Sequence, residues 1–268
     1  MSVSPPPDQG NDEYWHEYLT RGSPSERRAR QILKRIPHEP RCAICAAPFG
    51  GFGAPLMRLI GKRQSRQSPK MCDDCYSFLA SRHGGAEIEV SLLFADVRGS
   101  TTLAEGMTPA QFRELMSRFY STATKAVFDH DGGVDKFVGD ELVAMFYPLL
   151  TGERHAARAV EAAVALLRAT GHEDANGPWV PIGAGVHSGL AWVGSVGEGP
   201  RTELTVLGDN VNIAARLATT AGAGEVLVTT EAARAAGLEP KLDRRRLELK
   251  GKQELTEVVT LRVGPSPG

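Results

Sequence analysis

The sequence contains no apolar run that approaches the roughly 18 residues needed to cross a bilayer. Its start, Met-Ser-Val-Ser-Pro-Pro-Pro, shows neither the basic nor the apolar region of a signal peptide. Cysteine is scarce as well, with four in 268 residues. We therefore expect a cytoplasmic protein without a transmembrane segment, in which disulfide bonds are the least favoured use of those cysteines.

A large excess of one charge is also missing. The formal net charge is -1, but residues 1–85 carry 13 Lys and Arg against 8 Asp and Glu, whereas residues 86–268 carry 18 against 24. The two parts are therefore expected to do different jobs. A surplus of five positive charges without a basic stripe interleaved with aromatics is less than nucleic-acid binding usually requires. We predict that neither DNA nor RNA is a partner.

Composition predicts three segments. The first dozen residues are mostly Pro, Ser, Gly, Asp and Asn, and we expect a mobile tail over residues 1–22. A helix is predicted over residues 23–36, because it begins with Ser-Pro-Ser-Glu, a capping-box pair with Pro at the first helical position. This helix and the four cysteines make up a module over residues 23–85 that ends in a Gly-Gly linker, and a larger domain follows over residues 86–268.

The larger domain alternates predicted strands and helices. Residues 88–95 are apolar and β-branched, which predicts a buried strand, and Thr108 begins a long amphipathic helix. A β-hairpin with Asp140 at its tip is predicted from residues 134–138 and 142–147. Further elements are expected as helices at 153–169 and 210–218, strands at 182–186, 191–196 and 225–229, and a strand pair at 246–249 and 258–263. This order predicts an α+β fold with a mixed sheet.

Two aspartates of this domain follow predicted neighbouring strands. Asp96 precedes Val97-Arg98-Gly99-Ser100-Thr101, a turn of small and polar residues that suits phosphate. Asp140 follows the adjacent strand, and two like charges at one site would repel unless cations lay between them. The pair therefore suggests metal-assisted nucleotide chemistry, whereas either Asp alone is more typical of a turn or a helix cap.

Five motifs, in family order, resemble the catalytic domain of class III nucleotidyl cyclases. They lie at residues 94–101, 136–140, 185–189, 205–216 and 249–252, and the resemblance covers about residues 88–263. It implies a ferredoxin-like core that works as a head-to-tail homodimer, with each of two active sites drawing residues from both chains. A monomer would therefore be inactive.

The resemblance also implies roles for individual residues. Asp96, Asp140 and the carbonyl of Val97 match the ligands of two Mg²⁺ or Mn²⁺ ions, with which the ribose 3′-hydroxyl attacks the α-phosphorus and pyrophosphate leaves. Asn212 and Arg216 lie four apart on a predicted helix, hence on one face. They match the residues that orient the ribose and stabilise charge on the transition state.

Base choice is implied by Lys136 and Thr205, at the two specificity positions of the family. A Lys donates to a ring nitrogen of adenine and a Thr hydroxyl accepts from its exocyclic amine, so ATP is favoured over GTP. Thr205 departs from the Asp of many members and resembles the adenylate cyclase subgroup that uses Thr. Lys252 resembles a triphosphate-binding Lys, although Lys250 could take that role, and Leu190 stands where some members place a phosphate-binding Arg.

The cysteines form two Cys-x-x-Cys pairs separated by 26 residues, Cys42 with Cys45 and Cys72 with Cys75. Four thiolates suit a tetrahedral Zn²⁺ ion, which would stabilise a module too small to build its own core. An iron–sulfur cluster uses the same four ligands and is the alternative. Between the pairs, residues 49–63 are Gly-rich, then apolar, then basic, which fits either a partner or membrane contact or a loop packed under the cysteines.

The predicted function is that of an adenylate cyclase converting ATP to 3′,5′-cyclic AMP and pyrophosphate, regulated by the cysteine module through an unknown ligand or partner. The alternative is a catalytically silent relative that binds a nucleotide or a partner. A diguanylate cyclase is disfavoured by Lys136, Asn212 and Arg216. His187 is interpreted as a strand residue satisfied by its neighbours, and Asp209 and Asn210 as turn and capping residues.

Overall fold

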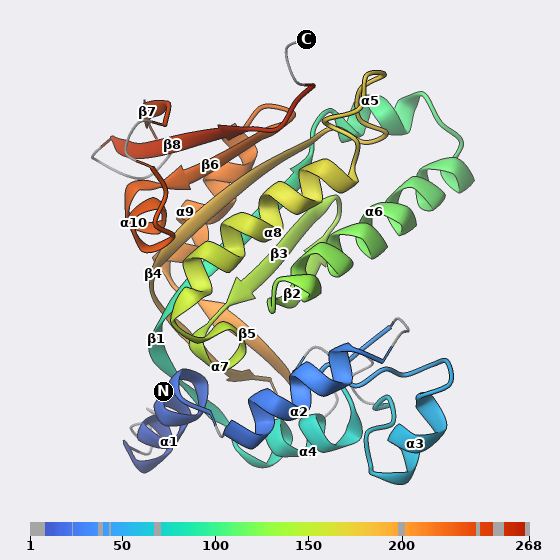
Figure 1. Ribbon diagram of the computed structural model, residues 1–268, viewed down its shortest axis with the longest axis vertical. Coiled ribbons are helices and arrows are strands. Elements are labelled where there is room, and N and C mark those ends of the chain that lie inside the picture. Colours follow the sequence, from blue (N-terminus) through green and yellow to red (C-terminus); the bar gives the residue numbers. More distant parts are fainter. Residues whose placement is uncertain are drawn as a thin grey trace, which may run out of the picture. The chain divides into compact units, whose positions relative to one another are not determined.

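The computed structural model describes residues 9–22, 24–36, 40–42, 44–66, 71–197, 202–239, 242–248 and 255–265. It divides into two compact units, one made of Met1–Ile88 with Trp192–Leu207 (unit 1) and one made of Glu89–Ala191 with Gly208–Gly268 (unit 2). Figure 1 shows the elements of both. Within the described ranges, no helix is long and apolar enough to span a membrane.

Unit 2 is built on a mixed sheet with the strand order β2-β3-β1-β4-β6-β8-β7. Its first part follows the order β1-α6-β2-β3-α8-β4, and the spatial order β2-β3-β1-β4 is that of a ferredoxin-like core. β4 and β6 pair in parallel, whereas β1 with β3, β2 with β3, and β6 with β8 pair antiparallel. The predicted α+β fold with a mixed sheet is confirmed.

The strands are β1 (Gly84–Val97), β2 (Gly133–Val138), β3 (Glu141–Phe146), β4 (Ile182–Val196), β5 (Glu203–Leu207), β6 (Glu225–Thr229), β7 (Arg244–Leu247) and β8 (Thr256–Arg262). The helices after β1 are α5 (Ser100–Glu105), α6 (Pro109–Asp129), α7 (Pro148–Thr151), the 3-10 helix η1 (Gly152–Arg154), α8 (His155–Ala169), α9 (Asp209–Thr220) and α10 (Thr230–Ala235). β1 and β4 each have residues in both units.

The main core lies between the sheet and the helices α6 and α8, which run along the same face in Figure 1. Met116, Phe119 and Val127 of α6 are buried there, as the amphipathic pattern predicts. Side chains alternate along β6, so that Val226 and Val228 join this core. Leu227 points to the other face and packs in a second cluster with residues of α9.

Local signals explain where α6 begins. The backbone N–H of Gln111 donates to the Thr108 hydroxyl at 3.3 Å, and its side-chain oxygen accepts from the Thr108 N–H at 2.9 Å. This is the predicted capping box.

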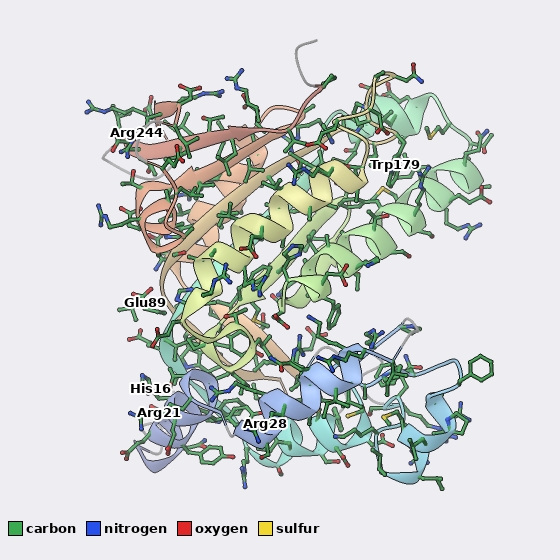
Figure 2. The ribbon with its side chains drawn as sticks, viewed as in Figure 1. His16, Arg21, Arg28, Glu89, Trp179 and Arg244 are labelled. Atoms are coloured by element: carbon green, nitrogen blue, oxygen red, sulfur yellow. The ribbon has the colours of Figure 1, made fainter. Side chains whose placement is uncertain are left out.

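Trp179 contacts both α6 and α8. Its ring, labelled in Figure 2, lies 3.9 Å from the guanidinium of Arg118 on α6. Its indole N–H donates to the carbonyl of Ala169, the last residue of α8, at 3.1 Å.

In unit 1, helices are α1 (Gln9–Thr20), α2 (Pro24–Lys34), α3 (Ala54–Leu59) and α4 (Asp73–Ser81). The tail expected over residues 1–22 is helical from Gln9 onward, and Trp15 and Leu19 of α1 are completely buried. The Trp15 ring meets Phe78 of α4 edge-on, with centroids 6.1 Å apart. Aromatic residues at helical spacing therefore override the polar composition of this segment. The helix predicted at 23–36 is α2, but its Ser23 cap lies outside the described residues.

Two features of the sheet differ from the sequence expectation. The strands predicted at 182–186 and 191–196 are one continuous strand, β4. β5 is not among the predicted strands, and it pairs antiparallel with the second half of β4, with Thr205 opposite Gly194. A glycine within a strand, such as Gly189, suggests that the strand ends there. β4 nevertheless stays extended through Gly189, because it pairs with a strand on each side.

Candidate active site

Asp96 and Asp140 come together because the strands that carry them are neighbours. Asp96 is the second-last residue of β1 and lies opposite Glu141 of β3. Asp140 follows Gly139 in the β2–β3 turn, and the Val97 N–H donates to the Asp140 carbonyl at 3.4 Å. Gly139 adopts a φ of 61°, which favours glycine in this tight turn. The expected hairpin with Asp140 at its tip is thus present.

Arg98 lies beside these carboxylates. Its guanidinium forms an ion pair with Asp96, and Nη1 donates to the Thr219 carbonyl near the end of α9 at 2.7 Å. Its backbone N–H donates to the Pro181 carbonyl at 2.8 Å. Burial lowers the pKa of Arg98, although the negative charges of Asp140 and Glu141 oppose this shift.

The site carries more negative than positive charge. Burial raises the pKa of Glu141, and the neighbouring Asp140 charge raises it further, while Arg98 acts in the opposite direction. Three carboxyl groups therefore share one guanidinium. Carboxylate and carbonyl oxygens are the donors that Mg²⁺ and Mn²⁺ prefer, so these residues fit a divalent cation.

Tyr120 of α6 supports the turn that presents Asp140. Its hydroxyl donates to the Gly139 carbonyl, and its ring stacks on Phe137 of β2 with centroids 4.2 Å apart. Sequence reasoning missed this contact. A tyrosine on an amphipathic helix carries no signal that its hydroxyl reaches a turn 19 residues away.

The other predicted site residues occupy several elements. Lys136 lies on β2 and forms an ion pair with the buried Asp135, with 3.3 Å between Nζ and the carboxylate. Thr205 is buried on β5. On α9, Asn212 is exposed and Arg216 is half-buried, with an Nη1 atom that is buried and lacks a hydrogen-bond partner among the described atoms. The predicted residues Lys250 and Lys252 lie outside the described residues.

His187 links β4 to two other elements. Its Nδ1 lies 2.9 Å from the Thr229 hydroxyl, and its Nε2 lies 2.9 Å from the side-chain oxygen of Asn210. The structural interpretation of His187 is confirmed. The capping role expected for Asn210 is wrong, because its amide also donates to the Leu190 carbonyl at 2.5 Å and so ties the start of α9 to β4.

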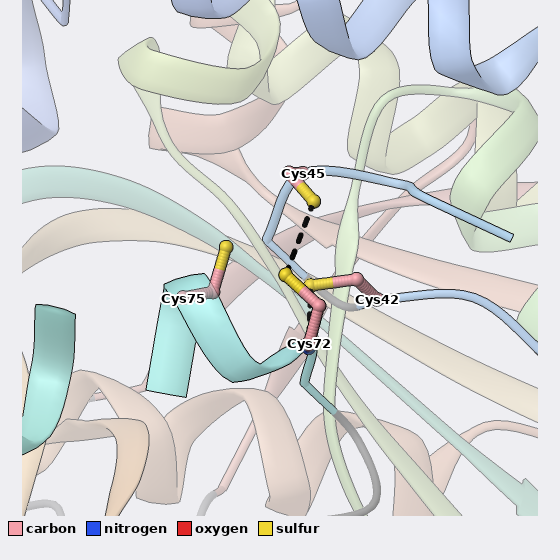
Figure 3. A group of neighbouring side chains, drawn as sticks. All are labelled: Cys42, Cys45, Cys72 and Cys75. Atoms are coloured by element: carbon pink, nitrogen blue, oxygen red, sulfur yellow. Dashed lines mark hydrogen bonds between the residues drawn. The ribbon is translucent and has the colours of Figure 1, made fainter. Parts of the chain in front are cut away.

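The four cysteines of unit 1 converge on one point, as Figure 3 shows. Their sulfur atoms all lie within 4.8 Å of one another, and Cys45 and Cys72 are 3.7 Å apart. The Cys72 N–H donates to the sulfur of Cys42 at 3.3 Å, and none of the four forms a disulfide. Cys75 lies in the first turn of α4.

The thiols of this cluster strongly influence one another. Burial opposes ionisation of Cys42, but hydrogen bonds from the other three thiols outweigh it and lower the pKa of Cys42 well below the ordinary value. Hydrogen bonding to Cys42 and Cys45 raises the pKa of Cys72 and that of Cys75. Ionising all four thiols at this spacing requires a cation between them, so the cluster could hold a metal ion.

Comparison with known families gives a match over most of the chain. The family described as the adenylate and guanylate cyclase catalytic domain matches residues 85–261. The chain belongs to this family. The predicted class III resemblance is therefore confirmed for the catalytic domain, and the family's description implies a nucleotide substrate.

Curated relatives match only part of the chain. The chain is 36% identical to adenylate cyclase 1 of Rhizobium meliloti over 134 residues, which cover 48% of this chain and 20% of the relative. It is 32% identical to an uncharacterised protein of Mycobacterium tuberculosis over 167 residues, covering 62% of this chain and 28% of that protein. The matched segments thus span less than a third of these longer relatives.

Solved structures share the fold of the cyclase domain. The guanylyl cyclase Cya2 superposes with a TM-score of 0.61 at 23% identity, covering 69% of this chain and 96% of that one. The adenylyl cyclase CyaB from P. aeruginosa has a TM-score of 0.58 at 24% identity, covering 69% and 99%. At these identities the likeness concerns the fold, and it includes cyclases of both nucleotide specificities.

Proposed function

We propose that this protein is an adenylate cyclase that converts ATP to 3′,5′-cyclic AMP and pyrophosphate at the interface of a head-to-tail homodimer. The observation that carries the proposal is the meeting of Asp96 and Asp140 at adjacent strand ends within a cyclase domain. Similarity to adenylate cyclase 1 of Rhizobium meliloti adds support.

Asp96, Asp140 and the carbonyl of Val97 are the proposed ligands of two Mg²⁺ or Mn²⁺ ions. When bound, such ions favour ionisation of the ribose 3′-hydroxyl and neutralise the triphosphate. The chain's own contribution is to fix the carboxylates. The Asp96–Arg98 ion pair and the Tyr120 contact to the turn hold them in place before substrate arrives.

Asn212 and Arg216 are proposed to act on the reacting part of ATP. Their spacing places both on one face of α9, where the Asn212 amide would orient the ribose. The Arg216 guanidinium would stabilise charge on the phosphorane, and its buried Nη1, which has no hydrogen-bond partner among the described atoms, would donate to an anion. Lys252 remains the proposed contact to the triphosphate.

Lys136 and Thr205 are proposed to recognise adenine. Lys136 offers donors to a ring nitrogen, and the Thr205 hydroxyl accepts from the exocyclic amine, whereas guanine presents the opposite pattern. In the proposed dimer, one chain supplies the carboxylates and its partner supplies the residues for base, ribose and phosphate. The dimer is therefore required for each complete site.

The test is a cyclase assay with purified full-length protein, Mn²⁺ and either ATP or GTP. We expect cyclic AMP from ATP, little product from GTP, and loss of activity by at least about a thousandfold in Asp140→Ala. Asp129→Ala, which removes an exposed carboxylate of α6, is the matched control and should retain activity. ATP binding without pyrophosphate release in the wild type would instead identify a silent relative.

We also propose that residues 23–85 form a metal-binding module, that residues 1–22 precede it, and that residues 86–268 form the catalytic domain. Cys42, Cys45, Cys72 and Cys75 would hold one Zn²⁺ ion. A tetrahedral site with Zn–S bonds of about 2.3 Å separates its sulfurs by about 3.8 Å. The 3.7 Å between Cys45 and Cys72 fits that spacing, whereas the atoms of an iron–sulfur cluster would separate the thiolates further.

The metal can be identified directly. Anaerobically purified protein should be colourless and contain about one zinc per chain, and Cys72→Ser should lower that content. A brown protein with visible absorption and stoichiometric iron and sulfide would exclude zinc and indicate a redox role.

We propose that the module regulates catalysis by changing the position of Thr205. The contact that couples them is the packing of Gly194 against Gly84 and Gly85 in unit 1. A Cβ placed on Gly194 would lie 2.5 Å from the Gly84 carbonyl oxygen and from the Cα of Gly85. Asn11 of α1 donates to the His83 carbonyl just before these glycines. Because Thr205 pairs with Gly194, a shift of the module backbone would move the base-recognition strand.

Gly194→Ala tests this coupling. We expect a raised KM for ATP and a weaker preference over GTP, because the added methyl group forces the packed strands apart. Gly264→Ala, which adds a methyl group into open space, is the control. Removing the module's proposed metal should change the KM for ATP in the wild type. The change should be much smaller in Gly194→Ala, because the contact that transmits it is already altered. Equal changes in both proteins would contradict the coupling.

A further inference from the structure

Four large apolar side chains of unit 1 are exposed around α3. Phe52 is fully exposed, and the exposed fractions of Leu59, Leu56 and Ile60 are 84%, 58% and 51%. Together they form the α3 patch, defined as Phe52, Leu56, Leu59 and Ile60. A concentration of exposed apolar residues over one short segment is typical of an interaction surface rather than of scattered surface residues.

The segment is firmly attached beneath this patch. Ala54 and Met57 on the opposite side of α3 are buried. The expectation of a loop packed under the cysteines therefore holds for these two residues but not for the exposed ones. Gly61 ends the helix with a φ of 78°, and the Lys62 N–H donates to the Met57 carbonyl at 2.8 Å. α3 and α1 lie at opposite ends of unit 1 in Figure 1.

The segment that carries the α3 patch contains basic residues but no acidic ones. Between Arg41 and Met71 the sequence has no Asp or Glu, whereas it has Arg58, Arg63 and other basic residues. Arg58 is exposed on α3 itself, between the patch residues. Lys62 and Arg63 pair with Asp74 and Asp73 of α4, which fixes their position next to the patch and reduces their net charge.

We propose that the α3 patch docks unit 1 onto an anionic lipid bilayer. Exposed aromatic and aliphatic side chains can enter the boundary between headgroups and acyl chains, while basic side chains stay at the headgroup level. An acidic protein surface would attract the same charges, but it would leave a fully exposed phenyl ring without an apolar counterpart. The bilayer supplies both the negative charge and the apolar layer.

The test is co-sedimentation of the full-length chain with vesicles of phosphatidylcholine alone or of equal parts phosphatidylcholine and phosphatidylglycerol. We expect binding to the anionic vesicles only, weakening as salt is added. The double variant Phe52→Ser/Leu59→Ser should lower the apparent affinity at least about tenfold, and Arg58→Glu several-fold.

Matched controls come from exposed residues elsewhere. Ile32→Ser removes an aliphatic side chain that is 62% exposed on α2, and Arg113→Glu reverses an exposed charge on α6. Both should bind vesicles like the wild type. The patch variants should also keep their zinc content and form cyclic AMP at the wild-type rate without vesicles. These two results would show that the variants are folded and that catalysis does not depend on vesicle binding.

Three outcomes would overturn the proposal. They are absence of binding to anionic vesicles at low salt, equal binding to both vesicle types, and unchanged binding of the double variant. If vesicles are not bound and the double variant alters the sedimentation coefficient in vesicle-free buffer, the α3 patch is an interface between copies of this chain instead.

Discussion

Tyr120→Phe isolates one hydrogen bond next to the proposed metal ligands. The substitution removes the hydroxyl that donates to the Gly139 carbonyl but keeps the ring that stacks on Phe137. The β2–β3 turn would then lose its hydrogen bond to α6 but keep the one from the Val97 N–H. Because Asp140 follows Gly139, looser backbone at the turn should weaken metal binding more than substrate binding.

The size of the effect follows from the net value of such a bond. One intramolecular hydrogen bond contributes about 0.5–1.5 kcal/mol, which corresponds to about a twofold to twelvefold change in an equilibrium constant. We expect the Mg²⁺ concentration for half-maximal cyclase activity to rise by that factor. At saturating Mg²⁺ the KM for ATP should be unchanged, because Tyr120 has no proposed contact with nucleotide.

The assay is a metal titration of the initial rate at fixed ATP. Ser121→Ala is the control, since its hydroxyl donates to the Ser117 carbonyl within α6 at 2.9 Å and does not reach the turn. The reasoning is refuted if Tyr120→Phe and Ser121→Ala have the same metal dependence. A rise in the KM for ATP at saturating metal would also refute it, because that would place Tyr120 at the substrate.

Three further predictions concern stability. Thr108→Ala should lower the free energy of unfolding by about 0.5–2 kcal/mol in urea, because α6 loses its capping box, and an unchanged value would show that the cap is dispensable. Glu225→Gln should cost about 1–2 kcal/mol at pH 7, since Arg245 lowers the pKa of Glu225 through hydrogen bonds of 2.5 and 3.2 Å. That difference is present above the ordinary pKa of about 4.3 and should vanish as pH falls through the lower folded value, which unfolding curves across this range would check. Removing the proposed zinc ion with a chelator should lower the melting temperature of unit 1 selectively, seen as a separate calorimetric transition, and a single unshifted transition would contradict a structural ion.

Elements with strong local signals could be predicted from the sequence. α6 has its capping box and apolar stripe, and the hairpin has a glycine that its turn requires. The adjacency of Asp96 and Asp140 followed from placing them at the ends of paired strands. β5 could not be predicted, because a five-residue strand is stabilised mainly by its pairing with β4.

The site contacts that could not be predicted join residues that lie far apart in the sequence. Arg98 meets the Thr219 carbonyl across 121 residues, and Asn210 meets His187 across 23. Spacing along the chain carries no information about such partners. Local reasoning therefore assigned Asn210 to a helix cap, although the fold offers it a partner on β4. The helix α1 with its two buried residues was missed for a related reason, since Phe78, which packs against Trp15, lies far along the chain.

The two segments that make up unit 1 determine how the cyclase domain of this protein could be fused to other proteins. A gene fusion joined at residue 86 would transfer residues 86–268, which contain nearly the whole segment matched by the cyclase family. Its hairpin of β4 and β5 would nevertheless arrive without Gly84 and Gly85, against which Gly194 packs. A chimera that keeps residues 84 and 85 with their cyclase should therefore inherit its nucleotide preference, whereas one that exchanges them is expected to change it.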